Sequence, residues 1–266
     1  MSGAGSHNPS VLEVFGLAKR YGEVVAVSEL SLSVAAGATL VLLGQNGAGK
    51  TTALRCMSGL LKPSAGRVLV GGVDSLADPD AVRAQVGLVP EVPGLYERMS
   101  ARSYLDYFGR VYGLDEATRS ARIGNLLELF GLSDAADRWL GTFSKGMRQK
   151  VALIRATMHR PGLVLADEPT SALDPDSARV AWSYLEGLRA GGAALVVCTH
   201  NMEEAQTLAG GIGIMARGRL LASGDLHALA RAAGLKRHRE VVERPTLEGV
   251  YLAIVGNREE DEARPA

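Results

Sequence analysis

The sequence predicts an α/β fold with three parts: a mainly parallel core sheet, an antiparallel β layer and an inserted α-helical subdomain. Three observations lead to this prediction. Short alternating strand patterns, interrupted by a glycine-rich loop, occupy residues 11–75. Helical spacing of apolar residues dominates from about 93 to 159, and strand and helix patterns then alternate from 163 to about 222. A chain of 266 residues can bury a sizeable core as one large domain with such an insertion.

The glycine-rich loop at residues 44–51 predicts a phosphate-binding site. It follows an apolar run at 39–43, typical of a buried strand, and precedes a segment with Leu54, Met57 and Leu61 on one helical face. The pattern G-x-x-x-x-G-K-[ST] in this setting cradles phosphates with backbone N–H groups. A chance glycine-rich turn is the alternative, and the context on both sides disfavours it. The residues expected to contact ATP here are Gly44, Gln45, Asn46, Gly47, Ala48, Gly49, Lys50, Thr51 and Thr52.

Within this loop, two side chains have distinct expected tasks. Lys50 is placed to contact the β- and γ-phosphates, and the Thr51 hydroxyl to ligate Mg²⁺. A partner for the metal follows the apolar run at 163–166, where Asp167 and Glu168 stand together. An acid at the end of a buried strand is costly unless function requires it. Asp167 is expected to hold Mg²⁺ through its water shell, and Glu168 to orient and deprotonate the attacking water. A surface acidic pair before the turn at Pro169 is the alternative, which fits the proline but not the strand.

A second anion site is predicted at Ser144. This residue is a candidate N-cap for a segment with Val151, Ile154 and Met158 at helical spacing. By itself, Ser-x-Gly before a helix is an ordinary N-cap, but its position before the two carboxylates favours anion binding. One nucleotide cannot easily occupy both loops of one chain. The second loop is therefore expected to serve a nucleotide bound to another copy.

In this order, the motifs resemble those of the ATP-binding cassette (ABC) ATPases over residues 11–225. Residues 44–51 match the family's Walker A motif, 144–147 its signature loop, 163–168 its Walker B motif and 171–174 its D-loop. Two single residues complete the resemblance: His200 stands in the place of the switch histidine, and Tyr21 in that of the aromatic that stacks on adenine. Apart from the motifs, His200 would more simply be a capping or solvated histidine, and Tyr21 a packing aromatic.

The resemblance implies a P-loop NTPase (RecA-like) core at residues 11–92 and 160–225, with the helical insert at about 93–159. It also implies ATP and Mg²⁺ as cofactors, Glu168 and His200 as catalytic residues, and two cassettes that sandwich two ATP molecules. Each ATP would lie between Walker A of one cassette and the signature residues Ser144 and Gly146 of the other. The second cassette is expected to be another copy or a homologous chain.

Two positions depart from the family's usual pattern. The signature reads Ser-Lys-Gly-Met rather than Ser-Gly-Gly-Gln, but it keeps the serine and second glycine, which carry the phosphate contacts. Glu91 stands where a glutamine is usual. An ionised glutamate only accepts hydrogen bonds, whereas glutamine also donates. Glu91 is expected to lie near the nucleotide and Mg²⁺, where its charge would tighten the metal and repel phosphate, with hydrolysis preserved.

Composition restricts the partners. The 29 basic and 29 acidic residues balance, so there is no electrostatic case for a nucleic-acid partner. No apolar run approaches the ~20 residues that span a bilayer, and no signal peptide is expected. A transport role therefore requires a separate ABC membrane permease, with this chain peripheral on the cytoplasmic face of the cell membrane. Cys56 and Cys198 lie in apolar surroundings and are expected to be buried structural thiols.

The expected function is that of an ATP-binding and ATP-hydrolysing subunit that energises export. Residues 90–96 and 246–252 resemble those of ABC-2-type exporter cassettes, including drug-resistance and sodium-efflux ATPases. The alternatives are the ATPase of an importer, a soluble ABC ATPase of translation or DNA repair, and a regulatory module without hydrolysis. The chain has one copy of each motif, which disfavours the translation type. The gap between Walker A and Walker B is short, which disfavours the repair type. The presence of both Lys50 and Glu168 disfavours a module without hydrolysis.

The two ends of the chain are predicted to be less regular. Residues 1–9 are expected to be disordered, and 226–266 to form a partly disordered C-terminal extension. That extension carries a basic run at 236–239, expected to be a solvated face with membrane headgroups as the alternative partner, and a helix candidate at 247–255.

Overall fold

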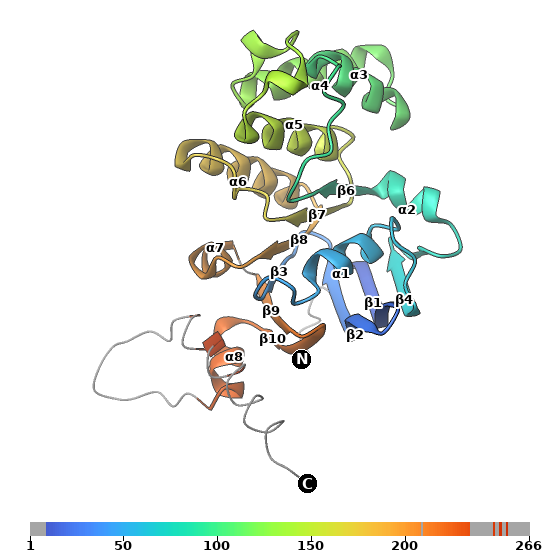
Figure 1. Ribbon diagram of the computed structural model, residues 1–266, viewed down its shortest axis with the longest axis vertical. Coiled ribbons are helices and arrows are strands. Elements are labelled where there is room, and N and C mark those ends of the chain that lie inside the picture. The colour runs from blue at the N-terminus through green and yellow to red at the C-terminus, as the bar shows by residue number, and fades with distance from the viewer. Residues whose placement is uncertain (1–8, 209, 235–246, 248–249, 252–253, 255–266) are drawn as a thin grey trace, which may run out of the picture.

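The computed structural model describes residues 9–208, 210–234, Leu247, Val250, Tyr251 and Ile254. The predictions for residues 1–8 and for the basic run at 236–239 lie outside this part of the chain. Its described strands form a mainly parallel sheet and an antiparallel sheet, with helices packed around them (Figure 1). The predicted α/β class, with a parallel core and an antiparallel layer, is confirmed.

The core sheet has the strand order β10-β9-β3-β8-β7-β6 among the described residues. All neighbouring pairs are parallel except β9 with β10, which form an antiparallel edge. Such a sheet needs cover on both faces. The strands are β3 (Thr39–Leu43), β6 (Val86–Val89), β7 (Leu163–Asp167), β8 (Ala194–Thr199), β9 (Gly211–Ala216) and β10 (Arg219–Gly224).

The antiparallel sheet has the order β2-β1-β4-β5 and lies beside the core sheet. Its strands are β1 (Ser10–Tyr21), β2 (Val24–Ala35), β4 (Ala65–Val70) and β5 (Val73–Asp74). The first two have 12 residues each, so the expectation of short strands was wrong for this hairpin. The register shifts between β1 and β2 show that bulges interrupt the pairing, which explains why the alternation reads as shorter segments.

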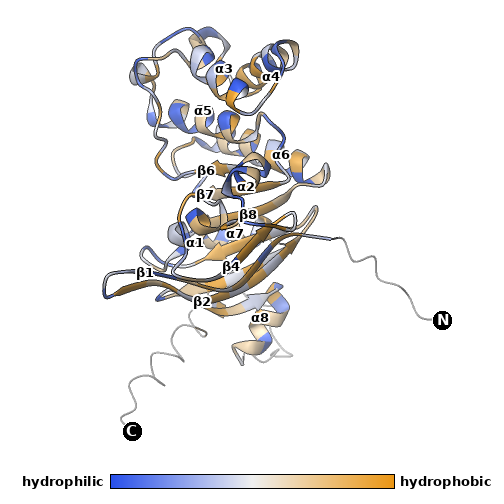
Figure 2. Ribbon diagram, turned by 90° about the vertical axis from the view of Figure 1, so that its right-hand side faces the viewer, coloured by the Kyte–Doolittle hydropathy of each residue, from blue (hydrophilic) through white to orange (hydrophobic). Residues whose placement is uncertain are grey.

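Alternate residues of the core strands enter two different hydrophobic clusters. Val164 and Ala166 of β7 join the cluster that includes the helical subdomain, whereas Leu163 and Leu165 join the cluster shared with the antiparallel sheet. This alternation follows from the two-residue period of a strand. Figure 2 shows the hydrophobic residues concentrated along these strands. Helix α1 (Lys50–Met57) packs in the second cluster, so the helix of the phosphate loop is fixed between the two sheets.

The helical subdomain contains α3 (Ala101–Val111), α4 (Glu116–Leu129) and α5 (Lys145–Thr157). Ser100, Asp115 and Ser144 cap these helices, each accepting a hydrogen bond from the N–H three residues later. Figure 1 shows the three helices together beyond β6 and β7. The apolar stripes predicted for α3 and α4 pack inside, as expected: Tyr104, Leu105, Ile123, Leu126, Leu127 and Phe130 are buried, while Phe108 and Tyr112 are partly buried.

The remaining helices are α2 (Pro79–Gln85), α6 (Pro175–Ala190), α7 (Met202–Leu208) and α8 (Leu226–Ala232). The sequence analysis did not anticipate α2, although Asp78 caps it and Pro79 begins it. Leu61, expected on the face of α1, lies beyond that helix, which ends at Met57. The four described residues of the 247–255 candidate are helical and share a buried cluster with α8. No helix within the described residues is long and apolar enough to cross a membrane.

Candidate nucleotide-binding site

The phosphate loop connects β3 to α1 with a backbone that only glycine adopts easily. Gly47 and Gly49 have φ angles of 83° and 96°, in the left-handed region. A Cβ atom on Gly49 would lie 2.2 Å from the carbonyl oxygen of Ala26, so a side chain there is excluded by space as well as by conformation. The loop is thus pressed against β2 of the neighbouring sheet.

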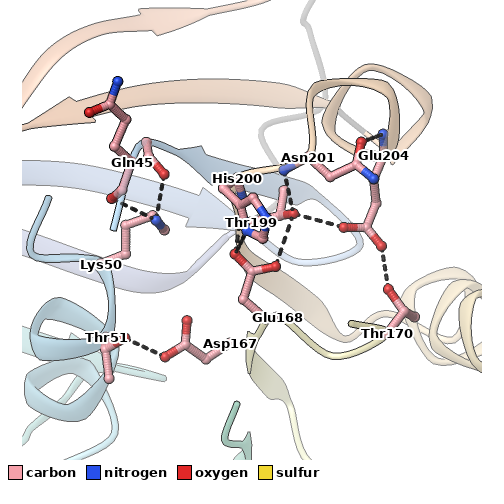
Figure 3. A network of polar contacts seen from close by, with 11 residues as sticks. Gln45, Lys50, Thr51, Asp167, Glu168, Thr170, Thr199, His200, Asn201 and Glu204 are labelled. Atoms are coloured by element: carbon pink, nitrogen blue, oxygen red, sulfur yellow. Dashed lines mark hydrogen bonds and ion pairs between the residues drawn. The ribbon is translucent and has the colours of Figure 1, made fainter. Parts of the chain in front are cut away.

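The N-terminus of α1 and one lysine concentrate positive charge at this loop. Gly49 provides no side-chain cap for α1, so the first N–H groups of the helix are available to an anion. Lys50 is only 6% exposed, and its Nζ donates to the carbonyl oxygens of Gly44 at 2.5 Å and Gln45 at 3.1 Å (Figure 3). The arrangement fits a triphosphate, which needs a cation and several backbone donors at one place.

Two side-chain oxygen atoms, Oγ1 of Thr51 and Oδ2 of Asp167, lie together and suit a small divalent cation. The Thr51 hydroxyl donates to Oδ2 of Asp167 at 2.5 Å, so Walker A and Walker B meet through these side chains (Figure 3). Burial raises the pKa of Asp167; Glu91 and Glu168 raise it further, against the hydrogen bond from Thr51 and the charge of Lys50. A bound cation would favour the ionised acid.

The donor set fits Mg²⁺ rather than a metal held by the protein alone. Among the described residues, no group of three or more His, Cys, Asp or Glu side chains could hold a metal ion. Mg²⁺ typically binds through one or two protein oxygens and takes its remaining ligands from phosphates and water. Thr51 and Asp167 would supply those protein oxygens.

Glu91 lies at the same place as these metal-binding candidates. It is exposed, and together with Thr51, Pro90 and Asp167 it lines a small cleft. Gln149 of α5 donates from Nε2 to the Pro90 carbonyl at 3.4 Å, which ties the segment before Glu91 to the helical subdomain. The structure therefore brings Glu91 close to the predicted metal site.

Glu168 and His200 form the adjacent part of the site. Glu168 follows β7 with a φ angle of 48°, in the left-handed region, and its N–H donates to the carbonyl oxygen of Cys198 at 2.9 Å. Its Oε1 accepts from the backbone N–H of His200 at 2.9 Å and lies 2.7 Å from His200 Nδ1 (Figure 3). Glu168 as a whole is 8% exposed. The structure therefore places the two residues that are expected to be catalytic in direct contact, a pairing that the sequence did not predict.

Ser144 and Gly146 lie elsewhere, at the start of α5. Ser144 caps the helix through Met147 N–H at 3.2 Å, and within the described residues it makes no hydrogen bond to the phosphate loop. A Cβ on Gly146 would approach the carbonyl oxygen of Ala172 to 2.9 Å, so the signature loop packs on the D-loop. The structure thus brings together signature and D-loop, and not signature and Walker A of the same chain.

Tyr21 ends β1 and is 48% exposed, with the Lys19 ammonium 5.2 Å from its ring centroid. Among the described residues, no hydrogen bond or ring contact joins Tyr21 to the phosphate loop directly. The hairpin that carries it does reach the loop, since Ala26 of β2 abuts Gly49. The strand pair that abuts the loop therefore carries an exposed aromatic ring, of the kind that can stack on a base.

Sequence reasoning missed several neighbours of these residues. Gly218 lies between β9 and β10, and its N–H donates to the Ala48 carbonyl at 3.1 Å, which supports the loop from another side. Arg217 and Gly218 both have positive φ, as a tight hairpin turn requires, and Arg-Gly between two strand patterns was the available signal. Thr199 and Glu204, which lie behind Glu168, had no comparable signal because their contacts are long-range.

The two cysteines stay outside this chemistry, as predicted. Cys56 and Cys198 are buried free thiols. Burial raises the pKa of Cys56 to about 11 and that of Cys198 well above its usual value, so neither thiol is a ready nucleophile.

Comparison with known proteins gives a consistent result. The sequence model of the ABC transporter family matches residues 27–171. The chain is 41% identical to the ABC transporter ATP-binding protein NatA of Bacillus subtilis (strain 168), over 77% of this chain and 84% of NatA. It is 37% identical to the daunorubicin resistance ATP-binding protein DrrA2 of Streptomyces coeruleorubidus, over 92% of this chain and 77% of DrrA2. It is 38% identical to Nod factor export ATP-binding protein I of Ralstonia nicotianae, over 85% of this chain and 71% of that protein.

Solved structures show the same relationship. An ATP-binding subunit of an ABC transporter superposes with a TM-score of 0.85 at 30% identity, over 92% of this chain and 99% of that one. A dimeric ATP-binding cassette in a post-hydrolysis state, bound to ADP and Pi, superposes with a TM-score of 0.74 at 25% identity, over 81% and 98%. The chain therefore belongs to the ABC transporter family, in which it is an ATP-binding and ATP-hydrolysing subunit.

Proposed function

We propose that this subunit energises export through a separate membrane permease, bound peripherally at the cytoplasmic face of the cell membrane. The observation that carries the direction of transport is the set of relatives. One is named for daunorubicin resistance and another for Nod factor export, and each matches most of this chain.

The proposed catalytic unit comprises residues 11–225, with the helical insert at about 93–159. Lys50 and the backbone of residues 44–52 hold the phosphates, and Tyr21 stacks on the base. Mg²⁺, held by Thr51 and Asp167 with Glu91 beside them, would neutralise charge on the phosphates. Glu168 orients and deprotonates the water that attacks the γ-phosphate, and His200 holds the Glu168 carboxylate in place. The close contacts of Thr51 with Asp167 and of His200 with Glu168 support these roles.

The complete site is proposed to form between two cassettes, either two copies of this chain or this chain and a homologous one. Ser144 and Gly146 would contact the phosphates bound by the partner's Walker A loop. Their separation from the chain's own phosphate loop supports this arrangement, as does the dimeric form of a structural relative bound to ADP and Pi. Nucleic acid is not a proposed partner, because the acidic and basic residues balance.

The helical subdomain is proposed to transmit closure of the dimer to the permease. Helix α5 begins at the signature loop, and through Gln149 it also contacts the segment before Glu91. A change at either end of the nucleotide site can therefore move the subdomain, which projects beyond the core sheet in Figure 1.

The test is co-purification of the membrane partner followed by transport in inside-out membrane vesicles. An exporter gives ATP-dependent accumulation inside such vesicles, and the Glu168→Gln variant of the same complex gives none. ATP-dependent release of preloaded cargo instead would indicate an importer. A chain that captures no membrane protein and has full ATPase activity alone would favour the soluble, non-transport class.

A further inference from the structure

A second carboxylate, Glu204, lies on the other side of Thr199 from Glu168 and accepts hydrogen bonds from three side chains, of which Figure 3 shows those of Thr199 and Thr170. Thr199 Oγ1, at the end of β8, donates to Oε2 of Glu204 at 2.8 Å. The hydroxyl of Thr170 donates to Oε1, as does the indole Nε1 of Trp182 on α6, at 3.2 Å. Such a complete set of donors suits an ionised carboxylate, which only accepts.

The start of α7 explains why Glu204 turns toward these partners. Asn201 Oδ1 accepts from the N–H groups of Glu203 at 3.0 Å and Glu204 at 3.1 Å, so Asn201 caps the helix. A glutamate three residues after a cap commonly reaches back to the N–H of the capping residue. Here that N–H already donates to Thr199 Oγ1 at 3.0 Å, and the Glu204 carboxylate is therefore available to Thr199, Thr170 and Trp182.

The Thr199 hydroxyl lies between two carboxylates. It is 2.8 Å from Glu204 Oε2 and 3.4 Å from Glu168 Oε2, and the residue is 0% exposed. A hydroxyl has one proton to donate, and the shorter distance assigns it to Glu204. Oε1 of Glu168 is already occupied by His200, so Oε2 is the oxygen left to receive a proton from water.

We propose that Glu204 is a positioning residue for hydrolysis, which holds the Thr199 proton and so keeps Oε2 of Glu168 free for the attacking water. The inference rests on the role of Glu168 proposed above. Without Glu204, the Thr199 hydroxyl would donate to Oε2 and compete with the water for that oxygen. Thr170 immediately precedes the D-loop at 171–174, so the same carboxylate also fixes the start of the loop that packs on Gly146.

The test is a double-mutant cycle in the full chain, with kcat and KM for ATP measured separately. Glu204→Gln keeps the shape of the side chain. Its oxygen would stay with the donors Thr170 and Trp182, so its NH₂ group would face Thr199 and turn the hydroxyl proton to Glu168. We expect kcat to fall about tenfold, the effect of one misplaced hydrogen bond, and KM to stay within about twofold.

The second arm of the cycle removes the competing donor. Thr199→Val in the Glu204→Gln background should raise kcat to within about twofold of the Thr199→Val single variant, because no hydroxyl then occupies Oε2. Thr199→Ser keeps the hydroxyl and should not restore kcat, which makes it the matched control. A merely structural role for Glu204 predicts that the losses of the two single variants multiply.

Two outcomes overturn the proposal: an unchanged kcat in Glu204→Gln, or multiplicative losses in the double variant. If thermal unfolding shows that Glu204→Gln is unfolded at the assay temperature, Glu204→Asp replaces it in the same cycle. Its shorter carboxylate cannot hold Thr199 and Thr170 together, and the same outcomes apply. Glu168→Gln separates the two levels of argument: full turnover in that variant refutes Glu168 as the base, whereas loss of turnover with a failed cycle refutes only the role of Glu204.

Discussion

Both the ring Nδ1 and the backbone N–H of His200 meet the same oxygen of Glu168, Oε1, at 2.7 and 2.9 Å. His200, which directly follows β8, therefore fixes one oxygen of the Glu168 carboxylate. The two carboxylate oxygens consequently have different surroundings. Glu168 and His200 therefore form one structural unit, and a substitution of either residue should affect the other.

Glu168→Gln should bind ATP but hydrolyse it more slowly, by a factor on the order of 10² or more, because the amide cannot take up a proton. The glutamine oxygen can still accept from the His200 N–H, so the local fold should persist. Size-exclusion chromatography with ATP should show an accumulated dimer. Wild-type turnover would place the base elsewhere, with Glu91 or a His200-centred network as the next candidates.

Lys50→Ala should abolish ATP binding, since the cation buried beside the Gly44 and Gln45 carbonyls would be lost. Equilibrium binding of a fluorescent ATP analogue measures this directly. Lys62→Ala, which removes an exposed lysine near the end of the same loop–helix unit, should bind normally. Near-normal affinity in Lys50→Ala would contradict the assignment of the phosphate loop.

Ser144→Arg should leave ATP binding intact but prevent dimer closure and hydrolysis, because a bulky cation would fill the space that the partner's phosphates occupy. Binding, ATPase rate and light scattering with ATP give the three readouts. Ser120→Arg places the same side chain on the exposed surface of α4 and should leave all three unchanged. Full ATPase activity from a Ser144→Arg protein that remains monomeric with ATP would refute the shared site.

Substitution of Glu91 should change the Mg²⁺ requirement of the ATPase activity, because Glu91 lines the same cleft as Thr51 and Asp167. Glu91→Gln removes one negative charge but keeps an acceptor oxygen. It should need more Mg²⁺ for half-maximal ATPase activity and retain that activity within about tenfold, while Glu91→Ala should lose more and uncouple hydrolysis from the permease. Glu116→Gln, on the exposed surface of α4, is the control in the Mg²⁺ titration. Superimposed curves for wild type and both Glu91 variants would mean that this loop is only a mechanical contact.

An ion pair in the helical subdomain predicts a pH-dependent stability. Arg119 of α4 is buried and donates to Asp106 of α3 at 2.5 Å, and this hydrogen bond holds the pKa of Asp106 below its usual value. A lowered pKa stabilises the fold above the unfolded value of about 3.9, and the benefit is lost as the pH falls through the folded pKa. Asp106→Asn should therefore lower the urea midpoint at pH 7, and the difference from wild type should shrink as the pH is lowered below about 3.9. A difference that stays constant as the pH is lowered below this value would assign the effect to packing.

Much of the site followed from the sequence because its motifs impose local geometry. The glycine pattern at residues 44–51 was expected to bring the backbone close to an anion, and the structure adds that Gly49 has a left-handed backbone before the helix. Ser144 is an N-cap in both sequence pattern and structure. A functional role for Asp167, at the end of β7, and Glu168, just after it, could be inferred from the sequence. Acids at the end of a strand buried on both faces are costly, so they indicate a function.

The rest depended on contacts between residues far apart in the chain. Ala26 touches Gly49 through a backbone oxygen, which any residue type would supply, so its sequence carries no signal. Glu204 resembles an ordinary helix-start glutamate, and its role depends on which neighbour already holds the Asn201 N–H. The short helix α2 had its cap and proline at Asp78 and Pro79, but a helix of 7 residues gives too few turns for a clear apolar period.

The left-handed backbone of Glu168 places stability and activity in conflict at one residue. A glutamate in this conformation costs roughly 1 kcal/mol more than a glycine would. Glycine would relax the backbone and keep the N–H bond to Cys198, but it would remove the carboxylate together with its contacts to His200. On the role proposed for Glu168, every substitution that relaxes this backbone by removing the acid also ends turnover, so the strained glutamate is retained only while hydrolysis is needed.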